Sequence, residues 1–184
     1  SAFPVFDNQP FLAEEEHFIL TDIGSHVLDI CRFLFGEANT LFSLTQRVNP
    51  NIKGEDVANV LMQMQSGVHC YAEMSYASIL EKEAFPQTLV LVEGDRGSLH
   101  LTNDFELKVT TRGGTTIRKI DPVMYRWLDP AYAVVHSSIV DCNRDILKAL
   151  QGGQAETTGE DNLKTVQLVW ASYESASTGK RITL

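Results

Sequence analysis

The pattern of hydrophobic positions changes twice along the chain, from helical spacing to alternation and back to helical spacing. Between about residues 18 and 35 the hydrophobic residues recur every three or four positions, and Gly36 follows them. This spacing predicts a helix that ends at a glycine C-cap. The sixteen or so residues before it contain Pro4, Pro10 and an acidic run, and they predict an irregular segment.

The middle of the chain predicts strands. Hydrophobic and polar residues alternate in several short segments separated by turns that contain glycine, such as Ser66–Gly67, Gly94–Gly97 and Arg112–Gly114. In one pair of segments, Val60 and Met62 share one face of the first while Cys70 and Met74 share one face of the second. Strands linked in this way predict an antiparallel meander with one buried face. The segments run over residues 40–49, 56–65, 68–76, 87–93, 98–102, 105–111 and 115–120.

Helical spacing returns after residue 135. It predicts a helix over 136–150, and a second helix that opens at a capping box beginning with Thr158 and stops at Gly179, with a last short strand over 181–184. Helix, strands and then helices predict an α+β fold, with one open, mainly antiparallel sheet and helices on a single face. A chain of 184 residues is sized for a single domain, which we expect to span 1–184.

Composition narrows the function classes. The formal net charge is −9, so the surface repels phosphate backbones and we expect no nucleic-acid partner. No apolar run approaches the roughly 18 residues of a membrane-spanning helix, so we expect no membrane segment. Cys31, Cys70 and Cys142 are far apart, odd in number and without a CxxC pair, which predicts buried, reduced thiols and a cytoplasmic protein.

The first predicted helix carries the candidate chemistry. Asp22, His26 and Asp29 fall within about 60° of arc on one side of the helix, while the opposite stripe is apolar. A carboxylate one turn before a histidine can fix its tautomer and stabilise its protonated form, which suits a general base near neutral pH. The alternative is that this polar face is simply solvated. A metal site is disfavoured because a fourth ligand at recognisable spacing is missing.

Two further features of the sequence qualify this site. Gly24, in the first turn, costs about 1 kcal/mol of helix propensity against alanine, which suggests that something approaches the backbone closely there. The glycine-rich motifs that bind dinucleotides or phosphates, GxGxxG and GxxxxGK[ST], do not occur. We therefore expect no cofactor-binding residues in this chain.

Three segments resemble one known family. The first is Thr21 to Asp29 with Arg32–Glu37, which resembles the DxGxHxxD…LxG segment of the glucose–fructose oxidoreductase and inositol dehydrogenase family (Gfo/Idh/MocA). The second is the Val92–Leu99 turn, and the third is the C-terminal stretch with Tyr173–Ala176 and Thr178–Arg181. They occur in the family's order and are spread over most of the chain.

The resemblance implies a two-domain parent enzyme. Its Rossmann domain would bind NAD or NADP and supply a lysine. Its second domain, similar to the C-terminal domain of glyceraldehyde-3-phosphate dehydrogenase, would line the pocket for a sugar or polyol and form a homo-oligomer through its sheet. His26 and Asp22 map onto the family's catalytic pair, with His26 taking the hydroxyl proton and Asp22 orienting His26 or contacting the substrate. Asp29 maps to a position that contacts the substrate, supports the residues that contact it, or is structural.

The chain departs from the family pattern in one respect. The catalytic helix begins near residue 20, so the Rossmann domain is expected to be absent from this chain. A chain without it is expected to be inactive by itself. A second hypothesis from a different class is a stand-alone, non-catalytic module that binds carbohydrate or dimerises.

Overall fold

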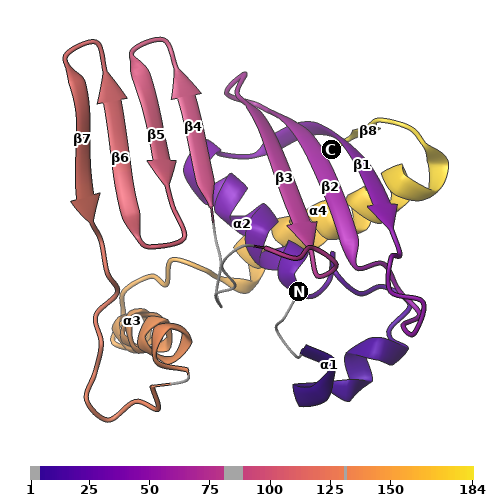
Figure 1. Cartoon of the computed structure of the whole chain (residues 1–184), viewed down its shortest axis with the longest axis horizontal. Helices are drawn as coiled ribbons and strands as arrows, with labels where there is room; N and C mark the ends of the chain where they lie inside the picture. The colour runs from indigo at the N-terminus through magenta and orange to yellow at the C-terminus, as the bar shows by residue number, and fades with distance from the viewer. Residues whose placement is uncertain (1–4, 81–88, 131) are drawn as a thin grey trace. The chain divides into compact units, whose positions relative to one another are not determined.

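The computed structural model describes residues 5–80, 89–130 and 132–184. Among the described elements helices come first, most of the strands follow, and two long helices and a short strand come last (Figure 1). In chain order the elements are α1 (Val5–Asn8), a 3₁₀ turn (Pro10–Glu14), α2 (Ile23–Phe35), β1 (Ala38–Gln46), β2 (Val57–Met64), β3 (His69–Ser75), β4 (Val90–Gly94), β5 (Gly97–Leu101), β6 (Glu106–Thr111), β7 (Gly114–Lys119), α3 (Ala133–Leu150), α4 (Gly159–Thr178) and β8 (Ile182–Thr183).

The described residues form two compact units. The first unit contains residues 5–80 and 157–184, and the second unit contains 89–130 and 132–156. Each has a four-stranded antiparallel sheet, in the order β3-β2-β1-β8 in the first and β4-β5-β6-β7 in the second. The predicted α+β class with antiparallel strands is confirmed. The hydrogen bonds, however, join the described strands into two sheets where the sequence predicted one, because alternation marks the faces of a strand but not its hydrogen-bonding neighbour. The single domain over 1–184 stays a prediction.

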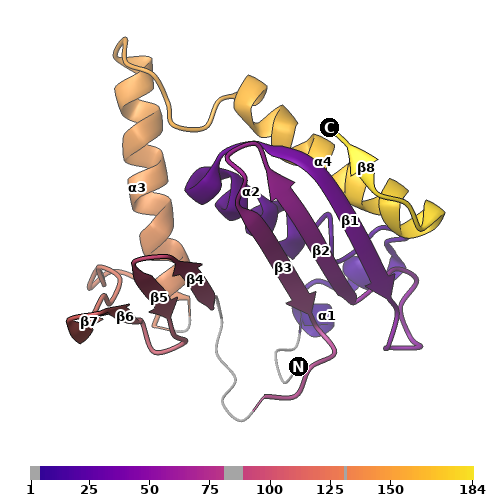
Figure 2. The same ribbon diagram turned by 90° about the horizontal axis from the view of Figure 1, so that it is seen from above.

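One face of the first unit's sheet forms the core. Val60 and Met62 are at most 1% exposed, whereas Leu61 between them is 52% exposed. Helix α2 packs against β3, and α4 packs against both β1 and α2. Figure 2 shows these two helices behind the same face of the sheet. The predicted faces of β2 and β3 and the one-sided helices are therefore confirmed for this unit. Each large apolar side chain buried here contributes about 1.5–3 kcal/mol to stability.

Helix α2 begins later than the sequence predicted. It starts at Ile23, whereas hydrophobic spacing suggested a start near residue 18. Phe18 and Leu20 are fully buried, but their backbone N–H groups donate to the carboxylate of Glu55 at 3.3 and 3.2 Å. The N–H of Ile19 donates to the carbonyl of Glu55 at 3.1 Å. Glu55 thus satisfies three backbone donors of this buried segment, which packs as an irregular turn before α2.

Gly24 is explained by packing within the protein. A Cβ at this position would lie 3.1 Å from the carbonyl oxygen of Ile19 and 3.2 Å from the sulfur of Met74. These contacts are tighter than ordinary van der Waals contacts, so the turn before α2 and strand β3 leave little room for a side chain. The close approach inferred from the sequence is therefore that of the protein's own core.

Helix α4 has the termini that the sequence predicted. The Thr158 hydroxyl accepts a hydrogen bond from the N–H of Asp161 at 3.2 Å, which satisfies one of the free donors of the first turn. Gly179 ends the helix in the left-handed conformation, with φ of 64°. The chain then turns back so that Ile182 pairs with Leu41 of β1. The predicted last strand is confirmed as β8.

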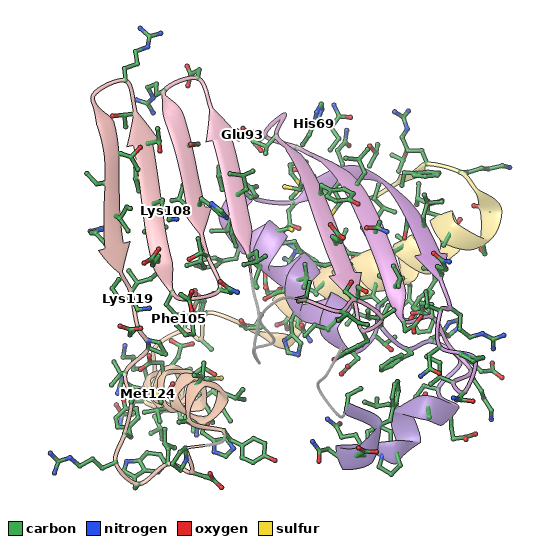
Figure 3. The ribbon with its side chains drawn as sticks, in the orientation of Figure 1. His69, Glu93, Phe105, Lys108, Lys119 and Met124 are labelled. Carbon is green, nitrogen blue, oxygen red and sulfur yellow. The ribbon has the colours of Figure 1, made fainter. Side chains whose placement is uncertain are left out.

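Fewer side chains are buried in the second unit than in the first. Phe105, with φ of 58°, lies in the turn from β5 to β6, and Lys119 lies at the end of β7, where its Nζ donates to the carbonyl of Asp104 (Figure 3). Helix α3 begins at Ala133, three residues before the predicted start at His136. Cys142 on this helix is exposed, contrary to the prediction of buried thiols, because helical spacing of apolar residues does not show how much of a helix is covered.

Candidate active site

Asp22 sits immediately before the first residue of α2. Its side chain does not cap the helix; instead, its Oδ2 accepts a hydrogen bond from the hydroxyl of Tyr76 at 2.9 Å. Oδ1 has no hydrogen-bond donor among the described residues. Asp22 is half-buried, and one of its carboxylate oxygens is fixed by Tyr76. The hydroxyl of Ser25 donates to the Asp22 carbonyl at 2.8 Å and fastens the first turn of the helix.

His26 follows Asp22 by one helical turn and is exposed. Within the part of the chain that the structure describes, its imidazole makes no hydrogen bond. The orientation of His26 by Asp22 that the family resemblance implied is therefore not among the described contacts, since Asp22 binds Tyr76. An exposed imidazole beside a fixed carboxylate can accept a proton from a bound hydroxyl group.

Asp29 makes different contacts from Asp22 and His26. Its Oδ1 accepts hydrogen bonds from the hydroxyl of Thr165 at 2.6 Å and from Nη1 of Arg32 at 3.3 Å. Thr165 is a buried residue of α4. The spacing predicted one shared arc, but Asp29 takes part in helix packing while Asp22, just before the helix, contacts the end of the sheet.

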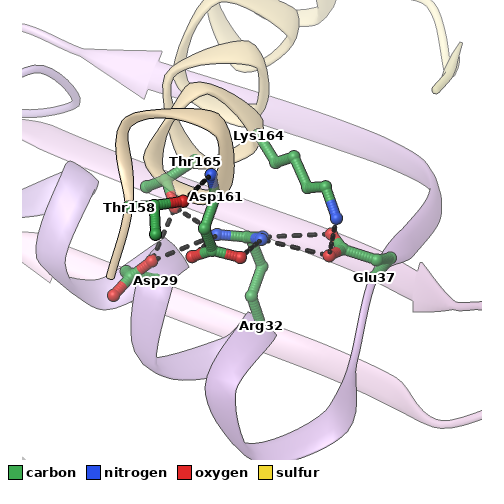
Figure 4. A network of polar contacts seen from close by, with 7 residues as sticks. All are labelled: Asp29, Arg32, Glu37, Thr158, Asp161, Lys164 and Thr165. Atoms are coloured by element: carbon green, nitrogen blue, oxygen red, sulfur yellow. Dashed lines mark hydrogen bonds and ion pairs between the residues drawn. The ribbon is translucent and has the colours of Figure 1, made fainter. Parts of the chain in front are cut away.

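Arg32 is the centre of a polar network that joins α2 to α4 (Figure 4). It is only 7% exposed. Its Nη2 donates to Oδ1 of Asp161 at 2.9 Å, and its Nε and Nη2 each donate to the carboxylate of Glu37 at 3.0 Å. Glu37 also accepts a hydrogen bond from Lys164 at 3.0 Å. The hydrogen bonds from Arg32 are the main cause that lowers the pKa of Glu37 to about 2, so this carboxylate stays charged.

A shallow hollow of about 460 Å³ lies on the same unit, near the other end of α4. The imidazole of His17 lies against the rings of Tyr173 and Trp170, with centroids 4.3 and 5.3 Å apart. The Tyr173 hydroxyl donates to Oε1 of Glu55 at 2.6 Å. Burial, followed by this hydrogen bond, raises the pKa of Tyr173. These residues brace the turn that leads to Asp22.

Sequence reasoning missed Tyr76, Glu55 and the role of Arg32. The alternation of β3 put Tyr76 in phase with the apolar face, which was the one available signal that it would meet the helices. Nothing in the spacing indicates that its partner would be Asp22, 54 residues earlier. Arg32 and Asp161 are 129 residues apart, so their ion pair is likewise invisible to local patterns.

The described residues were compared with the requirements of a metal site and of a membrane-spanning helix. Among the residues that the structure describes, no group of three or more His, Cys, Asp and Glu side chains could hold a metal ion. No helix in the described ranges combines the length and the apolar character needed to cross a bilayer.

Comparison with known proteins places this architecture in a family. The family model "GFO/IDH/MocA C-terminal domain" matches residues 4–100, more than half of the chain. The chain therefore belongs to the Gfo/Idh/MocA C-terminal domain family, as its motifs predicted.

Curated relatives extend the likeness to the whole chain. A D-apiose dehydrogenase from Paraburkholderia graminis is 44% identical, over 100% of this chain and 49% of that protein. A D-apiose dehydrogenase from Rhizobium rhizogenes is 42% identical, over 100% of this chain and 54% of that protein. The chain thus spans about half the length of these relatives.

A solved structure supports the same relationship. It is the crystal structure of an oxidoreductase from Agrobacterium radiobacter in complex with NAD⁺, L-tartaric acid and magnesium. It superposes with a TM-score of 0.95 at 42% identity, and the match covers 100% of this chain and 54% of that one.

Proposed function

We propose that this chain is the substrate-side domain of an NAD-dependent sugar dehydrogenase, with D-apiose or a closely related aldose as substrate. The observation that carries the proposal is the exposed imidazole of His26 one turn after Asp22, whose carboxylate is held through one oxygen by Tyr76. The two D-apiose dehydrogenases similar to the whole chain support the choice of sugar. Other sugars, inositols and polyols remain in the class that the site could accept.

The residues of this chain handle the proton in the proposed reaction. Oxidation of a hydroxyl group to a carbonyl removes a hydride from carbon and a proton from oxygen. The nicotinamide, when bound, supplies the hydride acceptor. His26 takes the proton of the substrate hydroxyl, and Oδ1 of Asp22 accepts a hydrogen bond from the substrate and orients it. This division of roles needs His26 neutral before the reaction and able to hold a proton after it.

The described residues do not fit the dinucleotide. A Rossmann site requires a parallel βαβ unit with a glycine-rich turn. All pairs among the described strands are antiparallel. In our proposal NAD, or alternatively NADP, is therefore held by a Rossmann domain of the full-length protein, outside this chain, and the isolated chain turns over no sugar.

The proposal is tested by measuring NADH formation in the full-length protein. With D-apiose and NAD⁺, His26→Ala should lower kcat by roughly 10²–10⁴-fold while the circular dichroism spectrum is preserved. The matched control is His100→Ala, which removes an exposed imidazole from β5 in the second unit. Unchanged turnover in His26→Ala would remove this residue from the mechanism.

A module without redox activity is the competing function. Calorimetric titration of the isolated chain with sugars and polyols, with and without NADH, separates the two. Sugar binding that is indifferent to the cofactor favours a stand-alone binding or dimerising module. The absence of binding fits a domain that needs its Rossmann partner.

We further propose that the open face of the first unit's sheet forms a homo-oligomer. Three large side chains on this face are strongly exposed: Leu44 at 58%, Leu61 at 52% and Tyr71 at 62%. An apolar patch amid polar residues such as Gln63 and His69 suits a self-complementary interface. Leu61→Asp should convert the oligomer to a monomer in light scattering, and a monomeric parent protein at micromolar concentration would contradict the proposal.

The cellular compartment is part of the same proposal. Cys31, Cys70 and Cys142 are free cysteines. Burial is the main cause that raises the pKa of Cys31 to about 12, so this thiol stays protonated and unreactive. We place the protein in the cytoplasm, where thiols are kept reduced.

A further inference from the structure

Tyr76 occupies a fixed place at the end of strand β3. Its backbone N–H donates to the carbonyl of Asp56 at 2.8 Å. Asp56 is itself buried, and its carboxylate accepts the N–H groups of Val48 and Asn49 at 2.7 and 2.9 Å. The main chain that carries Tyr76 is therefore tied to the loop between β1 and β2.

The aromatic ring of Tyr76 is held separately from its hydroxyl. It stacks on the ring of Phe18, with centroids 5.3 Å apart and planes inclined by 9°. Phe18 is fully buried, and its backbone is bonded to Glu55. The ring also packs against both hydrophobic clusters of the first unit. Loss of the hydroxyl alone would leave this packing in place.

The hydroxyl links this rigid framework to the candidate site. It donates to Oδ2 of Asp22 at 2.9 Å, and no other hydrogen bond reaches the Asp22 carboxylate from the described residues. Burial, followed by the negative charge of Asp22, raises the pKa of Tyr76, so the phenol remains a donor throughout the neutral range. A carboxylate at a helix N-terminus would otherwise rotate about two side-chain bonds.

We propose that Tyr76 is a positioning residue of the proposed dehydrogenase, which fixes the Asp22 carboxylate so that Oδ1 meets the substrate. This inference rests on the proposed function. A catalytic constellation must be held close to its productive geometry, and a misplacement of about 1 Å can cost 10²-fold in rate. Tyr76 supplies this restraint from the sheet, whereas Asp22 and His26 come from the helix.

Tyr76→Phe in the full-length protein tests the role of the hydroxyl. We expect kcat to fall roughly 10–100-fold, KM for the sugar to change less than about threefold, and the thermal midpoint to move little. Tyr132→Phe is the matched control, because it also removes one tyrosine hydroxyl, from a residue of the second unit that is 47% exposed. This control should keep the parent kcat.

A double-mutant cycle with Asp22→Asn separates positioning from a general structural effect. If Tyr76 acts through Asp22, adding Tyr76→Phe to Asp22→Asn should lower kcat less than about threefold further. Equal fold losses in both backgrounds would overturn the inference, as would an unchanged kcat in Tyr76→Phe. If the parent protein oxidises the sugar and Tyr76→Phe does so equally well, only this inference is overturned. No turnover of any sugar by the parent protein overturns the proposed function as well.

Discussion

Nη2 of Arg32 lies 2.9 Å from Oδ1 of Asp161, so a buried guanidinium joins the helix that carries His26 to the C-terminal helix. Asp29 and Glu37 complete the set of carboxylates around it. The network bridges the two helices that cover the sheet, and it holds α2 near its C-terminal end, whereas Tyr76 contacts the residue before its first turn. The candidate site therefore depends on contacts from both ends of its helix.

Removing this guanidinium should destabilise the protein. Arg32→Met leaves three carboxylates without their common partner, and we expect a loss of about 2–3 kcal/mol in the free energy of unfolding. The loss should fall below the ~3–5 kcal/mol of a fully buried pair because the carboxylates keep contact with water. Arg32→Lys should lose less, since it retains the charge but not the planar fork.

Urea unfolding measures both Arg32 variants. Lys53→Ala is the control, because Lys53 pairs with Glu14 at 2.8 Å on the exposed surface, where an ion pair adds little to stability. Equal effects of Arg32→Met and Lys53→Ala would show that burial adds nothing to the Arg32 network.

Glu37 should make stability depend on acidic pH. Its pKa in the folded protein is about 2, below its ordinary value of 4.5. The stabilisation it gives is therefore present above about pH 4.5 and is lost as the pH falls towards 2. Glu37→Gln should lower stability near pH 7 and flatten the dependence between pH 5 and 2. Urea midpoints across this pH range check the prediction, and parallel curves for the two proteins would contradict it.

Two tyrosines should ionise late in an alkaline titration. Burial raises the pKa values of Tyr76 and Tyr173 above the ordinary value of 10. Absorbance near 295 nm should show late-ionising phenol groups, and Tyr76→Phe and Tyr173→Phe should each remove one of them. Because these pKa values are raised, the associated stability is present below pH 10 and lost above it. Ionisation of all five tyrosines together at pH 10 in the folded protein would refute this.

The faces of β2 should respond differently to truncation. Met62 is 1% exposed and packs under the helices, so Met62→Ala should cost about 2–5 kcal/mol. Gln63 is the next residue and points to the open face, so Gln63→Ala should stay within about 0.5 kcal/mol. Urea unfolding of the two variants compares them directly, and similar losses would mean that the alternation does not define the core.

The sequence by itself determined the elements and their chemistry. Hydrophobic spacing predicted α4 with its Thr158 and Gly179 ends, the faces of β2 and β3, and the α+β class. The order of motifs predicted the family, which the family model confirmed. These features are local, because a helix or strand repeats its pattern within a few residues and a cap lies next to the helix that it ends. Asp22 and His26 could be nominated for the same reason.

Only the tertiary structure decided which residues meet. It started α2 at Ile23, after an irregular turn whose backbone donors are anchored on Glu55. It paired Asp22 with Tyr76, and Asp29 with Arg32 and Thr165 of α4, although the spacing predicts Asp22, His26 and Asp29 on one arc. It also divided the described strands between two sheets. Such contacts join residues far apart in the chain, and their energies depend on burial and geometry that exist only once the chain has folded.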